Sequence, residues 1–297
     1  MKASESPYRK IQWVPTGYTQ LDKILGGGIP LRRITEISGK YGVGKSTLAY
    51  AIIAAAQKER LDTLWADTEF SFGDDYAEMN GVEPTQLDLI QEHLAEDVLD
   101  MLEEWVSKHK NAVVVLDSIG GLLTKEQAEK GVGEKVIGGQ AKVVATFCRK
   151  ITPLLAMNNV ALVVLNHEFT DLMSGRLMTS GGAKLGYHKS IWLRLVPASK
   201  RLMKGEEQIG EVIQAEIRKN KLAPTMKQSV ELQLIYGEGF NRQADLLEDA
   251  LTKGVIRKEG QSYFIGEEKI CRGLPALREW FKNEKNEKKT YALLQSM

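Results

Sequence analysis

The segment from Gly39 to Ser46 constrains the fold more than any other part of the chain. It reads Gly-Lys-Tyr-Gly-Val-Gly-Lys-Ser, which matches the G-x-x-x-x-G-K-[ST] pattern of a loop that wraps the phosphates of a nucleotide. An apolar run with Ile34 and Ile37 precedes the segment, and a helix-forming run over 47–57 follows it. The pattern and its context predict a strand, a phosphate-binding loop and a helix in succession.

The residue types in this loop suit phosphate oxygens. Glycines adopt backbone angles that a β-carbon would forbid, so consecutive N–H groups can point at the phosphate. Lys45 adds a positive charge at the β- and γ-phosphates, and the hydroxyl of Ser46 can hold Mg²⁺. The positive end of a helix that begins near Lys45 favours the same anion. The candidate nucleotide-binding residues here are Gly39, Lys40, Tyr41, Gly42, Val43, Gly44, Lys45, Ser46 and Thr47.

Length and composition permit a large folded core but point to no particular partner. The chain has 297 residues, of which 43% are hydrophobic, so one large domain is expected, alone or with a small appendage. The formal net charge is +1, and any nucleic-acid surface must therefore come from local clustering of cations. Cys148 and Cys271 lie far apart and form no metal-binding spacing. We recognise no signal peptide and no apolar run near the roughly 20 residues that span a bilayer, and we expect a cytoplasmic protein without a membrane partner.

Strand-like and helix-like segments alternate through the middle of the chain. This alternation predicts an α/β fold with a mostly parallel sheet flanked by helices. Strands buried on both faces read as continuous apolar runs, and Val113 to Leu116 is one. We predict strands at 33–38, 63–67, 112–117, 160–166 and 190–196, and helices at 47–60, 95–108 and 138–157.

The pattern changes after Gly205. Further strands are predicted at 211–219 and 229–236, and the turn at 237–239 is a plausible boundary. A hairpin is predicted around 262–270, among short helices. We therefore expect a short N-terminal segment and lead-in over 1–32, a nucleotide-binding core over 33–239, and a small C-terminal α+β domain over 240–297.

Acidic residues stand at the ends of two predicted strands, where they would face the phosphate loop. Asp117 ends a strongly apolar strand, and a carboxylate there can bind Mg²⁺ directly or through water. Asp67 and Glu69 lie at and just past the end of the strand 63–67. Either can orient and deprotonate an attacking water, and the residues alone leave this choice open.

Two polar segments further along the chain are also candidates. Asn166 and His167 end the strand 160–166, at the edge where ligands of open α/β sheets gather. A histidine there can donate a hydrogen bond to a γ-phosphate and report its presence to the next loop, whereas a structural histidine bonded to backbone is the alternative. The basic segment 218–221 is either a solvated turn or a cationic finger that reaches a phosphate from outside the site.

In order and spacing, these segments resemble the RecA/RadA family of recombinases, most nearly its bacterial and phage branch, from about Pro15 to Phe281. Apart from the phosphate loop no single segment is very specific, but their collinear order across most of the chain is. The resemblance implies a RecA-like P-loop NTPase core that uses ATP and Mg²⁺. The matched segments are Thr16 to Asp22, Gly39 to Thr47, Ala66 to Glu69, Val115 to Ser118, Ser180 to Gly182, Arg218 to Pro224 and Ile235 to Gly239.

The resemblance assigns catalytic roles to three residues and metal-binding roles to two. Glu69 looks like the family's water-activating base, which decides against Asp67, while Lys45 and His167 would act on the triphosphate. Ser46 and Asp117 look like the residues on the Mg²⁺ side.

The resemblance also adds residues around the nucleotide. Tyr76 falls where the family stacks an aromatic ring on adenine, with a buried core tyrosine as the alternative. Lys219 and Lys221 match a pair of lysines that reach ATP bound to the neighbouring protomer. ATP would then lie at the protomer interface of a homo-oligomeric helical filament, and hydrolysis would depend on assembly.

By the same comparison, the segments 129–136 and 168–182 would be DNA-binding loops. Both contain glycine and lack periodicity, as expected of loops that become ordered on binding. Cations could contact backbone phosphates and apolar side chains could lie between bases, with a disordered surface loop as the alternative. The candidate DNA-binding residues are Lys130, Lys135, Met173, Arg176, Leu177 and Met178.

The chain departs from the bacterial pattern in two places. His167 stands where bacterial members carry glutamine and phage members carry histidine, which favours a phage or mobile-element source and a bacterial or phage-infected host cell. An imidazole can take up a proton near neutral pH, which glutamine cannot. Only about fourteen residues precede Pro15, but the segment 9–14 could add a strand to a neighbour's sheet with Trp13 as its anchor.

The main hypothesis is an ATP-dependent homologous recombinase with roles in DNA recombination and repair. It would polymerise on single-stranded DNA, pair that strand with homologous double-stranded DNA, promote strand exchange, and hydrolyse ATP in a DNA-stimulated reaction. One alternative is an accessory or regulatory ATPase paralogue that binds DNA without exchanging strands. A hexameric helicase motor is a third possibility, and it explains the segment 168–182 less well.

Overall fold

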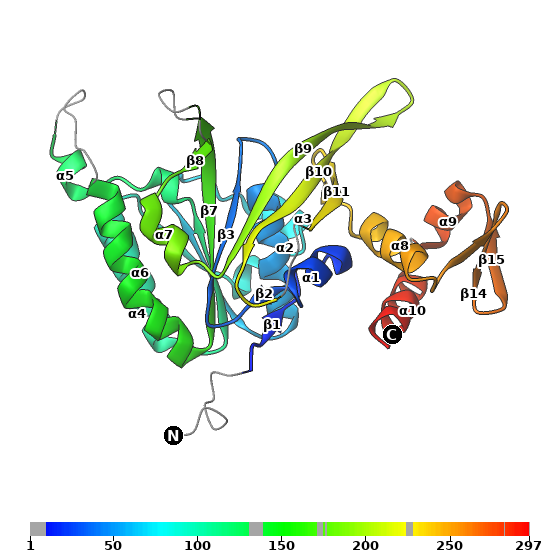
Figure 1. The fold of residues 1–297 in the computed structure, drawn as a ribbon, viewed down its shortest axis with the longest axis horizontal. Coiled ribbons are helices and arrows are strands. Elements are labelled where there is room, and N and C mark those ends of the chain that lie inside the picture. Colours follow the sequence, from blue (N-terminus) through cyan, green and yellow to red (C-terminus); the bar gives the residue numbers. More distant parts are fainter. Residues whose placement is uncertain are drawn as a thin grey trace.

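The computed structural model describes residues 10–130, 139–170, 175, 177–223, 228–281 and 283–296. Within them, a large sheet has the strand order β12-β11-β10-β9-β3-β7-β6-β4-β5, with β8 paired to β7 (Figure 1). Its strands are β3 (Ile34–Gly39), β4 (Asp62–Asp67), β5 (Asp88–Gln91), β6 (Ala112–Asp117), β7 (Val160–Thr170), β8 (Leu177–Thr179), β9 (Ile191–Lys204), β10 (Glu207–Asn220), β11 (Ser229–Ile235) and β12 (Gly239–Phe240).

The sheet is parallel around the phosphate loop and antiparallel beyond it. β3 lies between β7 and β9 and is parallel to both, while β6 is parallel to β7 and β4, and β4 to β5. From β9 onward the strands β10, β11 and β12 pair antiparallel. The predicted α/β fold with a mostly parallel sheet is therefore confirmed, with an antiparallel extension on one side.

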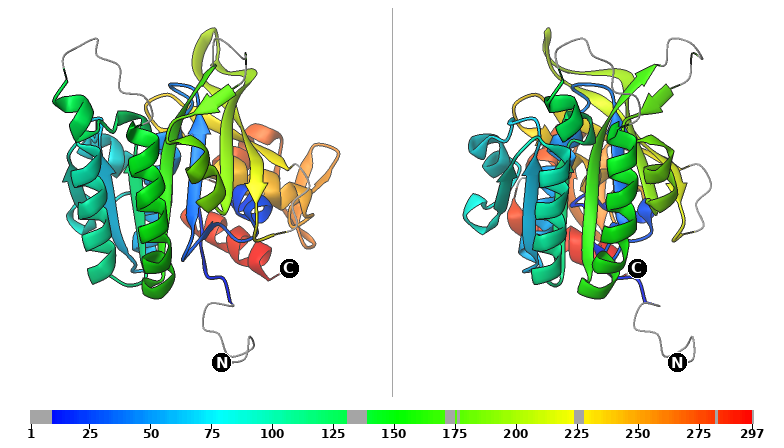
Figure 2. Two further views of the ribbon diagram at one scale, coloured as in Figure 1. Left: turned by 60° about the vertical axis from the view of Figure 1, so that its left-hand side comes forward. Right: turned by 90° about the vertical axis from the view of Figure 1, so that its left-hand side faces the viewer.

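Helices cover both faces of this sheet (Figure 2). Val113 and Val115 of β6 pack in the cluster that contains α1 and α2, whereas Val114 and Leu116 pack in the cluster that contains α4 and α6. Because alternate side chains point to opposite faces, a continuous apolar strand is buried on both sides. The helices are α1 (Thr19–Leu25), α2 (Lys45–Lys58), α3 (Asp74–Met79), α4 (Ala95–Lys108), α5 (Lys125–Ala128), α6 (Gly139–Asn158) and α7 (Gly182–His188), with 3₁₀ turns η2 (Pro84–Gln86) and η3 (Ile119–Gly121).

Trp13 is partly buried against the core of its own chain, and the expectation that it anchors a strand on a neighbour stays a prediction. β1 (Trp13–Val14) pairs antiparallel with β2 (Ile29–Pro30). Gly27 has φ 139°, and a β-carbon there would lie 2.7 Å from Cγ of the Trp13 ring. A larger residue at this position would displace the indole, so glycine is required where the ring packs.

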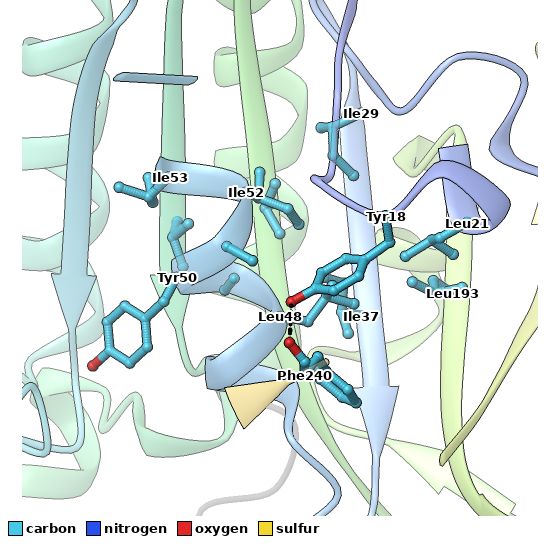
Figure 3. Close-up of a cluster of buried hydrophobic side chains, with 14 of the residues drawn as sticks. Tyr18, Leu21, Ile29, Ile37, Leu48, Tyr50, Ile52, Ile53, Leu193 and Phe240 are labelled. Atoms are coloured by element: carbon cyan, nitrogen blue, oxygen red, sulfur yellow. Dashed lines mark hydrogen bonds between the residues drawn. The ribbon is translucent and has the colours of Figure 1, made fainter. Parts of the chain in front are cut away.

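The segment after β11 leads from the sheet into a third hydrophobic cluster, separate from the two on the faces of the sheet. Phe240 packs beside Tyr18 in the main core, where the Tyr18 hydroxyl donates to the Phe240 carbonyl over 3.4 Å (Figure 3). The residues that follow form a cluster with Leu277 and Phe281 at its centre, both at most 1% exposed. We propose that 240–297 is a separate small domain. Its elements are α8 (Arg242–Thr252), β13 (Arg257–Glu259), β14 (Ser262–Ile265), β15 (Glu268–Arg272), α9 (Leu274–Phe281) and α10 (Glu284–Gln295).

The structure contains strand residues that the sequence pattern did not predict, β5 among them. β9 and β10 form a hairpin that extends well beyond 190–196 and 211–219 and projects from the sheet in Figure 1. The segment 168–182, predicted to be an irregular loop, begins with the last residues of β7 and includes β8. β7 continues because the side chain of Glu168, only 1% exposed, is held by Arg194 and Ser38. Within the described ranges, no helix is long and apolar enough to cross a membrane.

Candidate nucleotide-binding site

The carboxyl ends of the central parallel strands bring the predicted site residues together. β3 leads into the phosphate loop, β6 ends at Asp117, and β7 carries His167 at the position paired with Gly39. Glu69 follows the end of β4, which pairs with β6. Side chains from four neighbouring strands therefore meet at one edge of the sheet, where open α/β sheets bind ligands.

The loop from Gly39 to Ser46 has the geometry of an anion cradle. Gly42 and Gly44 have φ of 77° and 81°, a left-handed region that glycine enters without strain. α2 begins at Lys45 and runs for 14 residues, so its unpaired N–H groups face the loop. Lys45 Nζ donates to the carbonyls of Gly39, at 3.2 Å, and Lys40, at 2.9 Å. Burial lowers the pKa of Lys45, and the nearby acids Asp117 and Glu69 oppose that effect.

Ser46 and Asp117 lie where a divalent cation would bind beside the phosphates. The Ser46 hydroxyl donates to Asp117 Oδ2 over 2.8 Å. Burial raises the pKa of Asp117 to about 6, although the Ser46 hydrogen bond acts in the opposite direction. One hydroxyl and one carboxylate suit Mg²⁺, which is usually bound by one or two protein oxygens together with phosphate oxygens and water.

His167 bridges the lysine of the loop and the acid after β4. Its Nδ1 lies 3.2 Å from Lys45 Nζ, and its Nε2 lies 3.1 Å from Glu69 Oε1. The Ser118 hydroxyl donates to the same oxygen of Glu69. About a third of the Glu69 and His167 side chains is exposed, at 36% and 35%, so both groups are accessible to water and ligand.

Asp67, the other acid considered as a base, has a different environment. It is fully buried, and its carboxylate accepts from the backbone N–H groups of Glu69 and Phe72 and from the Gln91 side chain. These bonds hold the turn that carries Glu69. The geometry favours Glu69 as the group that contacts water, because the Asp67 carboxylate already accepts hydrogen bonds from the surrounding residues.

Tyr76 is half-buried at the edge of the main core. Its hydroxyl lies 2.9 Å from Thr47 Oγ1, and its ring packs edge-on against Tyr50 with centroids 6.0 Å apart. Tyr76 is thus held beside the first turn of α2, where its exposed part can contact the adenine of a nucleotide.

Lys219 and Lys221 are directed to α7. Lys219 Nζ donates to the carbonyl of Gly186 at 2.5 Å, and Lys221 Nζ to that of Tyr187 at 2.8 Å. Burial, followed by the charge of Lys221, lowers the pKa of Lys219 to about 8. The two amines repel each other, so an anion that binds both would relieve that repulsion.

The described residues include only part of the predicted DNA-binding set. Lys130, just past the end of α5, pairs through its Nζ with Glu126 of that helix at 2.9 Å. Met178 of β8 is 46% exposed and pairs across the strands with Phe169, which is 48% exposed. Lys135, Met173, Arg176 and the side chain of Leu177 lie outside the described residues.

The sequence did not identify the residues that position other side chains through hydrogen bonds or ion pairs. Ser118, which bonds Glu69, follows directly after the strand-end Asp117, and that position was a usable signal. Glu36, Lys189 and Arg194 form buried or half-buried ion pairs with partners far away in the sequence. Such partners become visible only when the sheet order is known.

These features define a class of protein. A phosphate loop between β3 and α2, with the acid Asp117 at the end of β6, on a parallel sheet is the arrangement of a P-loop nucleotide-binding protein.

Comparisons with known proteins then give the family. Residues 1–241 match the model of the RecA N-terminal domain. The protein RecA of Thermus aquaticus is 32% identical over 286 residues, which cover 95% of this chain and 84% of the relative. The RecA proteins of Chloroflexus aurantiacus and Aquifex pyrophilus are 31% and 34% identical, over 95% and 89% of this chain and 82% and 76% of theirs. The chain belongs to the RecA family of recombinases.

Proposed function

We propose that the chain is a DNA-dependent ATPase that polymerises on single-stranded DNA and promotes homologous pairing and strand exchange. The observation that carries the proposal is the linked set Lys45, His167 and Glu69 at the phosphate loop, next to the strand that leads to the segment 168–182. ATP and Mg²⁺ would be the cofactors. His167 also underlies our inference of a phage or mobile-element source.

The residues of the site have separable tasks in hydrolysis. A bound nucleotide would supply the phosphoryl group, and Mg²⁺ would neutralise charge on its oxygens. Lys45 and the N–H groups at the start of α2 would hold the phosphates. Ser46 and Asp117 would hold the metal. Glu69 would orient a water and accept its proton, because phosphoryl transfer is accelerated mainly by positioning and charge stabilisation.

His167 would report the state of the phosphates. It lies between Lys45 and Glu69, and a phosphate on Lys45 would compete for the same hydrogen bonds. Three residues later β7 ends at Thr170. A change in His167 can thus alter the segment where we propose DNA contact, which is a coupling between two binding sites.

The second half of the ATP site would come from a neighbouring protomer. Lys219 and Lys221 rest on carbonyls of α7, where they form a cationic pair suited to a phosphate from another copy. Exposed Phe169 and Met178 on adjacent strands offer apolar surface for unstacked bases. Base pairing between strands, rather than the protein, would read the sequence.

Electron microscopy tests the assembly. The chain would be mixed with single-stranded DNA and a non-hydrolysable ATP analogue, and Lys45→Ala would serve as the control that cannot hold the phosphates. We expect helical filaments with the wild type alone. Closed rings would favour a helicase motor, and the absence of any assembly would contradict the proposal.

A second function is a recombination accessory ATPase that binds DNA without exchanging strands. It is favoured by the packing of Trp13, the expected anchor on a neighbouring protomer, against Gly27 of its own chain. A strand-exchange assay with ATP separates the two functions. Filaments and DNA-stimulated hydrolysis without exchange would identify the accessory protein.

A further inference from the structure

A carboxylate lies in the centre of the sheet, away from the phosphate loop. Glu36 of β3 is fully buried between β7 and β9. Its Oε2 accepts from Lys189 Nζ at 2.5 Å, and that amine lies 3.7 Å from the centroid of the Trp192 ring. Its Oε1 accepts from the side-chain amide of Asn166 over 3.1 Å. A buried charge is costly unless fully paired, so a fixed arrangement of these groups is expected.

Asn166 fastens the chain that returns after β8. Its Nδ2 donates to the carbonyl of Ser180 at 2.9 Å, and its Oδ1 accepts from the Ser180 N–H at 3.1 Å. The side chain thus pairs with both backbone groups of one residue, as a neighbouring strand would. Ser180 lies between β8 and α7, at the end of the segment proposed to contact DNA.

The side chains of the adjacent residues Asn166 and His167 make contacts on opposite sides of β7. Successive side chains on a strand point to opposite faces. His167 therefore reaches Lys45 and Glu69 on one side, while Asn166 reaches Glu36 and Ser180 on the other. A displacement of this part of β7 moves both contacts together.

We propose that Glu36 is a positioning residue. Its Oε1 fixes the side-chain amide of Asn166, and that amide holds Ser180 near the end of the segment 168–182. Asn166 thereby couples this segment, which we propose contacts DNA, to the adjacent His167 at the phosphate loop. The inference rests on the proposed function. Glu36 touches neither nucleotide nor DNA, and it acts through Asn166. Lys189 balances its charge so that the carboxylate can be kept inside the sheet.

Two double variants of nearly equal volume separate the hydrogen bond from the ion pair. Glu36→Gln with Lys189→Gln removes both charges but keeps an acceptor for Asn166. Glu36→Met with Lys189→Met removes the charges and the acceptor. Each full-length protein is assayed for ATP hydrolysis with and without single-stranded DNA, and hydrogen exchange is measured at the Ser180 amide. Thermal melting by circular dichroism verifies folding.

The double variant Glu36→Gln with Lys189→Gln is expected to keep DNA stimulation of hydrolysis and the exchange rate of the Ser180 amide within about twofold of the wild-type values, because hydrogen-bonding groups are retained. The methionine pair is expected to lose DNA stimulation by about tenfold and to exchange the Ser180 amide about tenfold faster, while hydrolysis without DNA stays within about twofold. Equal behaviour of the two pairs, whether both retain or both lose stimulation, would overturn the proposal.

Asn166→Leu replaces the methionine pair if that pair fails to fold. It is expected to give the same loss of stimulation and the same faster exchange, and an unchanged Ser180 amide would overturn the clamp. If the wild type shows no DNA stimulation, the proposed function fails, while hydrogen exchange at Ser180 still decides the role of Glu36.

Discussion

Asp245 connects the C-terminal region to the core through a buried carboxyl group. It is 5% exposed, and its Oδ2 accepts from the backbone N–H of Thr19 at 2.6 Å and from the Thr19 hydroxyl at 3.0 Å. It thereby caps α1, whose own N-cap residue Tyr18 makes no side-chain cap. Its Oδ1 is buried and has no hydrogen-bond partner among the described residues.

This environment makes the free energy of unfolding depend on pH. Burial raises the pKa of Asp245 from 3.8 to about 6, although the bonds from Thr19 act in the opposite direction. The folded state keeps this proton at pH values where the unfolded chain has released it. The contribution of this group to the free energy of unfolding therefore falls as pH rises from about 4 to about 6. The total loss over this range corresponds to about 3 kcal/mol.

Asp245→Asn removes the ionisation and keeps a carbonyl oxygen that can accept from Thr19. We expect the variant to gain stability relative to the wild type between pH 4 and pH 8, by up to about 3 kcal/mol. The assay is urea unfolding followed by circular dichroism across that range. Asp22 lines the same cavity as Asp245, and burial raises the pKa of Asp22 to about 7. Because Asp22 is present in both proteins, its contribution largely cancels in the stability difference between them.

Glu248→Gln is the matched control, because it removes an exposed carboxylate from the same helix. Its difference from the wild type is expected to vary much less with pH. If the difference between Asp245→Asn and the wild type is constant from pH 4 to pH 8, the burial argument is refuted.

The other predictions concern the nucleotide site. Glu69→Gln is expected to slow hydrolysis by about 10² to 10⁴ while nucleotide binding persists, since a general base contributes about that much; normal turnover would move the base role to another residue. Lys45→Ala should abolish binding of a fluorescent ATP analogue, and unchanged affinity would contradict the role of its charge.

The sequence predicted those parts of the fold and site that depend on local pattern. The loop from Gly39 to Ser46 is specified by adjacent residues, and the apolar runs that lead to Asp117 and Asn166 are visible because both faces of these strands are buried. Glu69 was distinguished from Asp67 only by the family resemblance. The structure adds a reason, since Asp67 is bonded to the surrounding backbone.

Features that depend on distant partners were missed. Glu168 looks like a loop residue in the sequence, yet Arg194, 26 positions later, holds it inside β7. The outer half of β9 is mostly polar and exposed, so it lacks the apolar run that predicts a strand. The packing of Trp13 against Gly27 was not predicted, because the turn that follows α1 brings the two residues together only in the folded chain.

The central claim is that each ATP site is completed by lysines of the next protomer, and a mixing experiment tests it directly. Glu69→Gln supplies intact lysines without the base, while the double variant Lys219→Ala with Lys221→Ala supplies the base without the lysines. Each is expected to hydrolyse little ATP alone on single-stranded DNA. An equimolar mixture is expected to recover up to about one quarter of wild-type hydrolysis, because that fraction of randomly formed head-to-tail interfaces combines both intact halves. A mixture no more active than the sum of its two components would contradict the claim.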